Sequence, residues 1–329
     1  MRTNGDKGVG MARKVPSEAE VLRYFQTYSN WGRWGEDDQL GTLNLITPEK
    51  RVQAARLVDD GATVSCSRLV STEVTPESRP PLHPAPTHFI IKSGEQFANA
   101  PNPTTEIQAA LDYFGVAFHS ATITHLDSVG HVFWEGKMYN GFSSAMVTSA
   151  QGATIQSVDL AKDAGVTRGV LLDIPRLRGV DWPEPGDDIH GDELEAAERA
   201  QGVTVEPGDA LLVRTGFMRR RNELGPWDTL ADPLHAGMHA SCIPFLHDRG
   251  VALLGRDGLD ARGKAYKKVF SAIHQIGIVA LGLWLIDNCD FEGLAEACAE
   301  RDRWEFLFTM GPLRIEYGTG SPVNPIAVF

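Results

Sequence analysis

Residues 119–131 gather side chains that bind metal ions or carry protons. Three of the chain's ten histidines, His119, His125 and His131, lie here together with Asp127. Imidazoles and carboxylates bind divalent metals, and imidazoles exchange protons near neutral pH. His125 and Asp127 are two positions apart, so both project from one face of an extended segment. His131 joins them if the chain turns after Asp127, as the small residues that follow permit.

Each of these residues also has a purely structural interpretation. A lone histidine is commonly a packed or surface residue, and an aspartate commonly caps the turn that follows it. The grouping of four such side chains at this spacing favours a functional site. The pattern alone leaves open whether the site binds a metal or transfers protons without one.

The composition of the whole chain limits its partners. Hydrophobic residues make up 42% and charged residues 22% of the 329 positions, as in soluble globular enzymes. The net charge is −12 and no run of five or more basic residues occurs, which argues against a nucleic-acid or anionic-membrane partner. The four cysteines have no paired spacing, so we expect buried core thiols. Without an apolar leader or spanning segment, a cytoplasmic protein is expected.

The remaining elements predict an α/β fold. Helices are expected after the capping residues Ser17 and Thr47. Four continuous apolar runs are typical of strands buried on both faces: 169–174, 209–216, 251–255 and 276–282. Helical patterns occur between and after these runs, at 191–200 and 291–300. Strands that alternate with helices indicate a mixed central sheet with flanking helices.

No shift in composition marks a second large domain. We expect residues 1–60 to form an N-terminal arm with helices, which packs on the core or on a partner subunit. Residues 61–329 are expected to form one catalytic domain. Within it, residues 72–103 are rich in proline and polar residues around a short strand at 89–91. A long irregular segment of this kind is often a functional lid.

The histidine cluster resembles the HxGTHxDxPxH motif of the cyclase family of metal-dependent hydrolases, which includes bacterial kynurenine formamidase and isatin hydrolase. Further segments resemble other signatures of this family in the same order, and they span most of the chain: 31–44, 136–141, 207–216 and 318–327. The resemblance implies a swivelling β/β/α architecture and a homodimer or homotetramer. The apolar tail 324–329 would be buried in that assembly.

The resemblance also implies a metal site for Zn²⁺ or Mn²⁺. The metal ligands carried over onto this chain are His125, Asp127 and His131. A later pair, His274 and Asp287, would complete the site, although the family usually has Glu at the second of these positions. His131, His274 and Asp287 would be the catalytic residues.

Three positions depart from the family motif. Ala121 stands where the first motif histidine is expected, Ile123 where a glycine is expected and, as a milder change, Val129 where a proline is expected. In a straight strand, residues 121 and 125 would be about 13 Å apart, so the family's segment must bend. Isoleucine favours the extended form, in which His119 would lie about 20 Å from His125 and replace the missing ligand poorly unless the segment is looped. The ligand at 121 and the flexible residue at 123 have therefore changed together.

The main hypothesis is a metal-dependent hydrolase that opens an amide, lactam or lactone bond in a small, aromatic molecule. His131 would act as general base and then as acid. Four aromatic side chains would bind the substrate: Phe118, Trp134 and Tyr139, which are near the cluster in sequence, and Trp31 from an N-terminal segment.

Two alternatives use the same fold. The first is a metal-independent cyclase or dehydratase of secondary metabolism, with His125, Asp127 and His131 as acid–base groups. The second is a catalytically inactive, ligand-binding relative. The retained set of histidines and aspartates argues against an inactive relative, because no structural requirement demands those residues.

Overall fold

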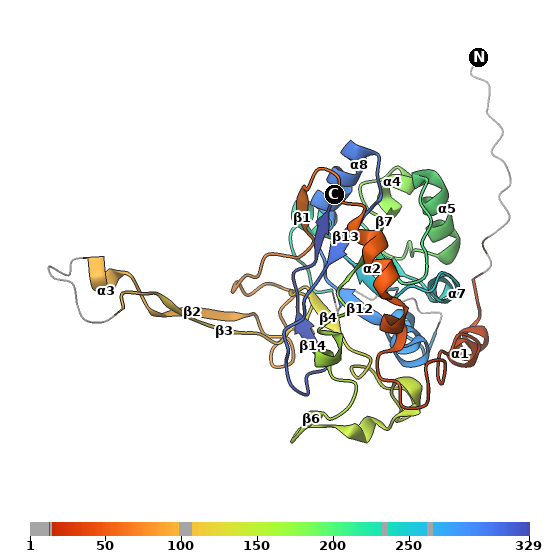
Figure 1. The fold of residues 1–329 in the computed structure, drawn as a ribbon, viewed down its shortest axis with the longest axis horizontal. Helices are drawn as coiled ribbons and strands as arrows, with labels where there is room; N and C mark the ends of the chain where they lie inside the picture. The colour runs from red at the N-terminus through yellow and green to blue at the C-terminus, as the bar shows by residue number, and fades with distance from the viewer. Residues whose placement is uncertain (1–12, 14, 99–106, 230, 232–235, 262–265) are drawn as a thin grey trace, which may run out of the picture.

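A nine-stranded mixed sheet forms the centre of the computed structural model (Figure 1). The structure describes residue 13 and residues 15–98, 107–229, 231, 236–261 and 266–329. The sheet confirms the predicted α/β class. Its strands, in spatial order, are β1 (Thr63–Ser65), β15 (Ile326–Val328), β13 (Glu305–Thr309), β7 (Val166–Asp173), β8 (Ala210–Arg214), β10 (Leu253–Arg256), β12 (Trp284–Asp287), β4 (His125–Asp127) and β14 (Gly320–Pro322).

The four middle strands, β7, β8, β10 and β12, run parallel, and the pairs outside them are antiparallel. Every residue of β8, β10 and β12 is buried. This agrees with the continuous apolar runs, because parallel strands are covered on both faces. Three of the predicted strands, at 169–174, 209–216 and 251–255, are confirmed.

The helices of the described chain are α1 (Glu18–Thr27), α2 (Pro48–Ala55), α3 (Glu95–Ala98), α4 (Ile174–Arg178), α5 (Gly191–Gln201), α6 (Phe217–Leu224), α7 (Ile243–Asp248) and α8 (Glu292–Arg301). All but α3, which lies far from the body of the molecule in Figure 1, are arranged around the central sheet. The first two begin where the capping residues predict. Ser17 caps α1 in a capping box with Glu20, and Thr47 caps α2 ahead of Pro48. Short 3₁₀ turns are η1 (Gly41–Leu45), η2 (Tyr139–Gly141), η3 (Ser144–Met146), η4 (Val158–Ala161) and η5 (Ala240–Cys242).

The predicted strand at 276–282 is wrong. These residues belong to η6 (Ile273–Leu281), a π-helix that ends at Gly282 in the left-handed conformation, with φ of 68°. The strand of this region is β12, which begins two residues later. A short apolar run has the same composition in a buried helix as in a buried strand, so its pattern cannot separate the two.

A two-stranded arm projects from the body of the molecule (Figure 1). It consists of β2 (Thr87–Lys92) and β3 (Leu111–Gly115), which are paired antiparallel. The predicted strand at 89–91 is therefore present but lies outside the central sheet. Residues 99–103 of the proline-rich segment lie outside the described residues.

The C-terminal tail is buried within its own chain. Phe329 is fully buried and its ring packs on that of Phe306. The tail was expected to be buried in an assembly, whereas β15 places it inside the central sheet of its own chain. The first twelve residues of the predicted N-terminal arm lie outside the described part, while α1 packs on η6 and α2 packs on β7. The division at residue 60 stays a prediction.

Small two-stranded sheets complete the fold: β5 (Val147–Thr148) with β6 (Gly152–Ala153), and β9 (Gly237–Met238) with β11 (Leu259–Asp260). All four cysteines are free and buried, which confirms their assignment as core residues. In the described part of the chain, no helix has the length and apolar character needed to cross a membrane.

Candidate metal and acid–base site

Strand β4 carries the centre of the predicted site. His125 and Asp127 are its first and last residues, and both are buried. They lie on the same face of an extended segment, as their spacing predicts. In the antiparallel pairing with β12, His125 is opposite Asp287, so these two side chains are neighbours on one face. The next residues turn, and the His131 N–H donates to the Ser128 carbonyl at 3.0 Å.

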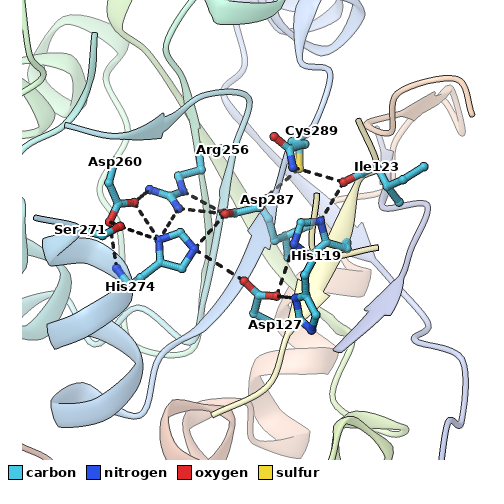
Figure 2. Close-up of polar contacts among 12 residues, drawn as sticks. His119, Ile123, Asp127, Arg256, Asp260, Ser271, His274, Asp287 and Cys289 are labelled. Atoms are coloured by element: carbon cyan, nitrogen blue, oxygen red, sulfur yellow. Dashed lines mark hydrogen bonds and ion pairs between the residues drawn. The ribbon is translucent and has the colours of Figure 1, made fainter. Parts of the chain in front are cut away.

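Asp127 lies at the meeting point of several imidazoles (Figure 2). Its Oδ1 is 2.7 Å from His119 Nδ1 and 3.4 Å from His125 Nε2. Its Oδ2 faces His274 Nε2 at 3.7 Å. The His131 ring is stacked on the His119 ring, with centroids 3.8 Å apart and planes 4° from parallel. The structure thus brings all five predicted metal and catalytic residues together, and it adds His119.

The straight-strand expectation for residues 119–125 is wrong. Residues 121–122 form a turn, and regular strand begins only at His125. Asn288 stabilises this turn by donating to the Ser120 carbonyl at 2.6 Å and to the Ile123 carbonyl at 3.3 Å. These bonds from a distant residue outweigh the preference of Ile123 for an extended backbone. As a result His119 folds back onto Asp127.

Gly320 provides the space that His119 occupies. This glycine lies on β14, directly opposite Asp127. A Cβ atom at position 320 would lie 2.6 Å from His119 Cε1 and 2.6 Å from the Leu126 carbonyl oxygen. On its other side, His119 Nε2 is held 3.0 Å from Thr319 Oγ1. The segment that resembled a C-terminal family signature therefore forms a wall of the site.

A buried layer of ion pairs holds His274 from behind (Figure 2). His274 Nδ1 is 3.0 Å from Asp260 Oδ1, and Nε2 is 3.1 Å from Asp287 Oδ2. Fully buried Arg256 pairs with the same two carboxylates, reaching Asp287 Oδ1 at 2.9 Å. Ser271 Oγ donates to Asp260 Oδ2 at 2.7 Å. The ends of β10, β11 and β12 and the first turn of η6 thereby form one network.

This network sets the charges of the site. Burial opposes the charged form of His274, but Asp260 and Asp287 outweigh it and raise the pKa of His274 to about 10. Burial likewise opposes ionisation of Asp127, yet His131 and the other imidazoles hold its pKa well below the usual value. Burial, together with neighbouring imidazoles, lowers the pKa of His131 to about 4. At neutral pH the site thus combines the Asp127 carboxylate with a cationic His274 and a neutral His131.

The donor atoms fit a divalent metal ion. Two overlapping sets of ligand atoms share Asp127, and within each set the atoms lie within 4.8 Å of one another: His119 with His131, and His125 with Asp287. Neither oxygen of Asp127 has a hydrogen bond of standard geometry within the described part of the chain, and neither does His119 Nδ1. Buried polar atoms are rarely left in this state unless another group completes them. Imidazole nitrogens with carboxylate oxygens suit Zn²⁺ or Mn²⁺.

A cavity of about 170 Å³ opens over the cluster. The six histidine and aspartate side chains lie on one side of it, and residues from other segments complete the lining, among them Glu77, His83 and Thr229. Glu77 is buried and pairs with Arg68 and Arg221. His83 Nδ1 is buried without a hydrogen bond in the described structure. Part of the proline-rich segment therefore lines the cavity, and its role as a lid stays a prediction.

The aromatic residues predicted to bind substrate separate into two groups. Phe118 packs against His119, with ring centroids 4.7 Å apart. None of the four is among the residues that line the cavity. Trp134 is stacked on Phe25, and the Trp31 indole N–H donates to the Val279 carbonyl at 2.7 Å. Proximity in sequence to the cluster, which was the signal for Trp134 and Tyr139, therefore does not place a side chain in the cavity.

Tyr139 also has a structural role away from the cavity: it is buried, and its hydroxyl donates to Asp38 at 3.0 Å. Conversely, sequence reasoning did not select Arg256, Asp260, His83 or Glu77 for the site. A partial signal existed for Arg256, because it ends an apolar strand and α/β sites gather at strand ends. For His83 and Glu77 no local pattern points to the cavity.

Comparisons with known proteins agree with this geometry. The family model named Cyclase matches residues 54–261. A crystal structure of a protein described as a novel cyclase is 31% identical to this chain and superposes with a TM-score of 0.80, covering 92% of this chain and all (100%) of the other. No curated protein matches the chain in sequence.

Two isatin hydrolases share the fold at lower identity. Isatin hydrolase A from Labrenzia aggregata, solved with benzyl benzoate bound, is 20% identical with a TM-score of 0.56, over 81% of this chain and 93% of the other. Isatin hydrolase A from Ralstonia solanacearum is 18% identical with a TM-score of 0.55, over 85% and 96%. The family match over most of the chain, the similarity to the cyclase structure and the shared fold lead to one conclusion. This chain belongs to the cyclase family.

Proposed function

We propose that this protein is a metal-dependent hydrolase that opens an amide, lactam or lactone bond in a small molecule. One observation carries the proposal: both oxygens of buried Asp127 face imidazole nitrogens, while neither has a standard hydrogen bond in the described structure. A carboxylate in this state is suited to a cation held jointly with those imidazoles.

His125, Asp127 and Asp287 would hold Zn²⁺ or Mn²⁺, with His119 as a further ligand, which leaves the His131 imidazole free to move protons. Such a metal lowers the pKa of a bound water and polarises the carbonyl that is attacked. His119 would compensate for Ala121, because the turn at residues 121–122 brings its ring to the face of Asp127. The departure from the family motif is then a change of ligand position and not a loss of the site.

The remaining residues of the site would orient the imidazole of His274 and transfer the proton of the attacking water. His131 lines the cavity beside Asp127, where its imidazole can accept a proton from water and return it to the leaving group. His274 is fixed between Asp260 and Asp287, so its Nε2 is directed toward Asp127. A fixed cationic imidazole stabilises negative charge that develops nearby during attack on a carbonyl.

The cavity limits the substrate to a small molecule. Its volume of about 170 Å³ is below the range of about 300–1,000 Å³ that is usual for ligand pockets. Phe118 beside His119 supplies an aromatic surface, which supports a substrate with an aryl group.

The test uses a panel of aryl amides, lactams and lactones with the full-length protein. We expect hydrolysis that EDTA abolishes and that added Zn²⁺ or Mn²⁺ restores. His131→Ala should lower kcat/KM by about 10²–10⁴-fold, while His247→Ala, which alters a histidine on α7 outside the site, should not. Turnover that survives EDTA but is lost in His131→Ala would contradict the metal mechanism and support the metal-independent cyclase or dehydratase.

A further inference from the structure

The turn that follows His119 is bonded to Arg68 at two points. The Arg68 backbone N–H donates to Thr124 Oγ1 at 2.9 Å, and its guanidinium Nη1 donates to the Ala121 carbonyl. Thr124 Oγ1 in turn donates to the Asn288 carbonyl at 2.6 Å. One residue outside the turn therefore holds it with both its main chain and its side chain.

A buried carboxylate fixes the guanidinium group of Arg68. Arg68 Nη2 is 3.2 Å from Oε1 and 3.1 Å from Oε2 of Glu77. Arg221 on α6 donates to the same carboxylate, with Nη2 2.7 Å from Oε2. Arg68 is 7% exposed and Glu77 is 2% exposed. Three separate segments therefore meet at Glu77: the residues after β1, the proline-rich segment and α6.

Stability alone explains this cluster poorly. Two guanidinium groups share one buried carboxylate, so the three side chains together carry an excess positive charge. Burial lowers the pKa of Arg68, although Glu77 opposes this change. Buried ion pairs often add little to stability, and some instead specify one arrangement of the chain. Here the arrangement includes the carbonyl of Ala121, the residue that stands in place of the first motif histidine.

We propose that Arg68 is a positioning residue of the site: it bonds to Glu77 and to the turn, and so keeps the His119 ring beside Asp127. This inference rests on the proposed function, in which His119 is a metal ligand that compensates for Ala121. Arg68 is not among the described residues that line the cavity, so it acts through the turn and not on the substrate. A guanidinium suits this role, because its rigid fork presents several donors in fixed directions.

Binding of Co²⁺ to the full-length protein tests the proposal, because the visible absorption of bound Co²⁺ depends on the number and kind of its ligands. Arg68→Met removes the side-chain bonds to the turn and leaves Glu77 paired with Arg221, so the variant should fold. Arg68→Lys, which keeps the buried charge, is the second variant. His119→Ala removes the proposed ligand itself.

Arg168→Met is the matched control. The Arg168 side chain is 6% exposed, against 5% for Arg68, and it is also paired with carboxylates, those of Asp209 and Glu305. Arg168 lies on β7 and is not among the described residues that line the cavity. A loss of buried ion pairs that acts only on stability should therefore appear in this variant without any change in Co²⁺ binding.

We expect Arg68→Met and Arg68→Lys to lower the Co²⁺ affinity by about 10–100-fold, the range for losing a group that orients a metal site. Their Co²⁺ absorption should resemble that of His119→Ala, while Arg168→Met keeps the natural absorption and affinity. The double variant Arg68→Met, His119→Ala should bind Co²⁺ no more weakly than His119→Ala alone, because both substitutions act through one imidazole.

Two results would overturn the proposal. The first is natural Co²⁺ absorption and affinity in both Arg68 variants. The second is a double variant in which the two losses of affinity add in full, which would show that Arg68 and His119 act independently.

A natural chain that binds no Co²⁺ would contradict the proposed function instead. NMR of the metal-free protein with labelled histidine rings then tests the positioning separately. The His119 resonances should move in Arg68→Met and stay unchanged in Arg168→Met. Unchanged His119 resonances in Arg68→Met would overturn the proposal.

Discussion

Asp127 is the residue on which the proposed chemistry depends most. It is buried on β4, it faces imidazoles from three separate segments, and both ligand sets include it. Five histidines line the cavity, and Asp127 lies within 4 Å of three of them, His119, His125 and His274. No other carboxylate in the described site faces as many of them. A substitution of Asp127 should therefore alter metal binding without disrupting the surrounding fold.

Asp127→Asn should remove metal binding and lower kcat/KM by about 10³-fold or more, because the charge that holds the ion is lost. Isothermal titration with Zn²⁺ and a hydrolysis assay measure the two effects. Asp248→Asn, an exposed aspartate on α7, is the control and should change neither. Metal affinity that is unchanged in Asp127→Asn would place the ion elsewhere.

Gly320 tests whether His119 belongs to the site. Gly320→Ala should displace the His119 ring, because the added Cβ would lie 2.6 Å from Cε1. We expect metal affinity to fall by about 10–100-fold, the range for losing a group that orients a metal site. Gly311→Ala is a matched control, since a Cβ there meets nothing within 4 Å. Equal affinities in both variants would show that His119 is not needed.

At the residue level, the sequence predicted which side chains lie together but not the course of the backbone between them. His125, Asp127 and His131 could be placed because a two-residue spacing on a strand fixes their face. His119 was assigned a distance of about 20 Å because Ile123 favours an extended chain. Asn288, more than 160 positions away, bonds to the turn and reverses that expectation. Bonds of this kind leave no local pattern.

Among the elements, the junction of β10, β11, β12 and η6 gives the site its rigidity. Arg256→Met would leave Asp260 and Asp287 buried with one cation fewer, so we expect a loss of about 3–5 kcal/mol of unfolding free energy. Urea denaturation measures it. Arg219→Met, which removes exposed pairs with Asp181 and Glu223, should cost less than about 1 kcal/mol. Similar losses in the two variants would mean that the buried network is not structural.

A second histidine group joins α5 to η5 away from the site. The rings of His190 and His239 are 4.4 Å apart, and Tyr266 hydroxyl is 3.1 Å from His239 Nε2. Burial, with the neighbouring His190 and Arg13 charges, lowers the pKa of His239 to about 4. Between pH 6.5 and about 4 the unfolded chain therefore binds a proton that the folded chain does not. Stability is lost as the pH falls through this window.

His239→Gln should remove part of that acid sensitivity. We expect the natural chain to lose about 1–2 kcal/mol more unfolding free energy than the variant between pH 7 and pH 5. Urea denaturation at the two pH values provides the comparison. Parallel losses in both proteins would show that His239 titrates normally in the fold.

Element prediction succeeded where termini carried chemical signals. Ser17 and Thr47 fixed the starts of α1 and α2 because their side chains cap the first turn. The apolar run at 276–282 gave no such signal, and η6 was mistaken for a strand. A segment that is buried on all sides has no hydrophobic periodicity in its sequence. Its helical conformation is therefore decided by packing against α1 and β12.

At the scale of the whole molecule, the order of strands and helices was enough to predict the α/β class, and the motifs were enough to predict the family. The projection of the arm was not predictable, because Phe89 to Ile91 read as an ordinary buried strand. Their exposure follows from where β3 pairs with them, outside the central sheet.

Metal analysis of the full-length protein, purified without chelators, tests the central claim most directly. Mass spectrometry of the metal content should find about one or more Zn²⁺ or Mn²⁺ ions per chain, as expected for a closed set of imidazole and carboxylate ligands. Asp127→Asn purified in the same way should contain almost none. A content well below one per chain, with hydrolytic activity that survives EDTA, would contradict the account.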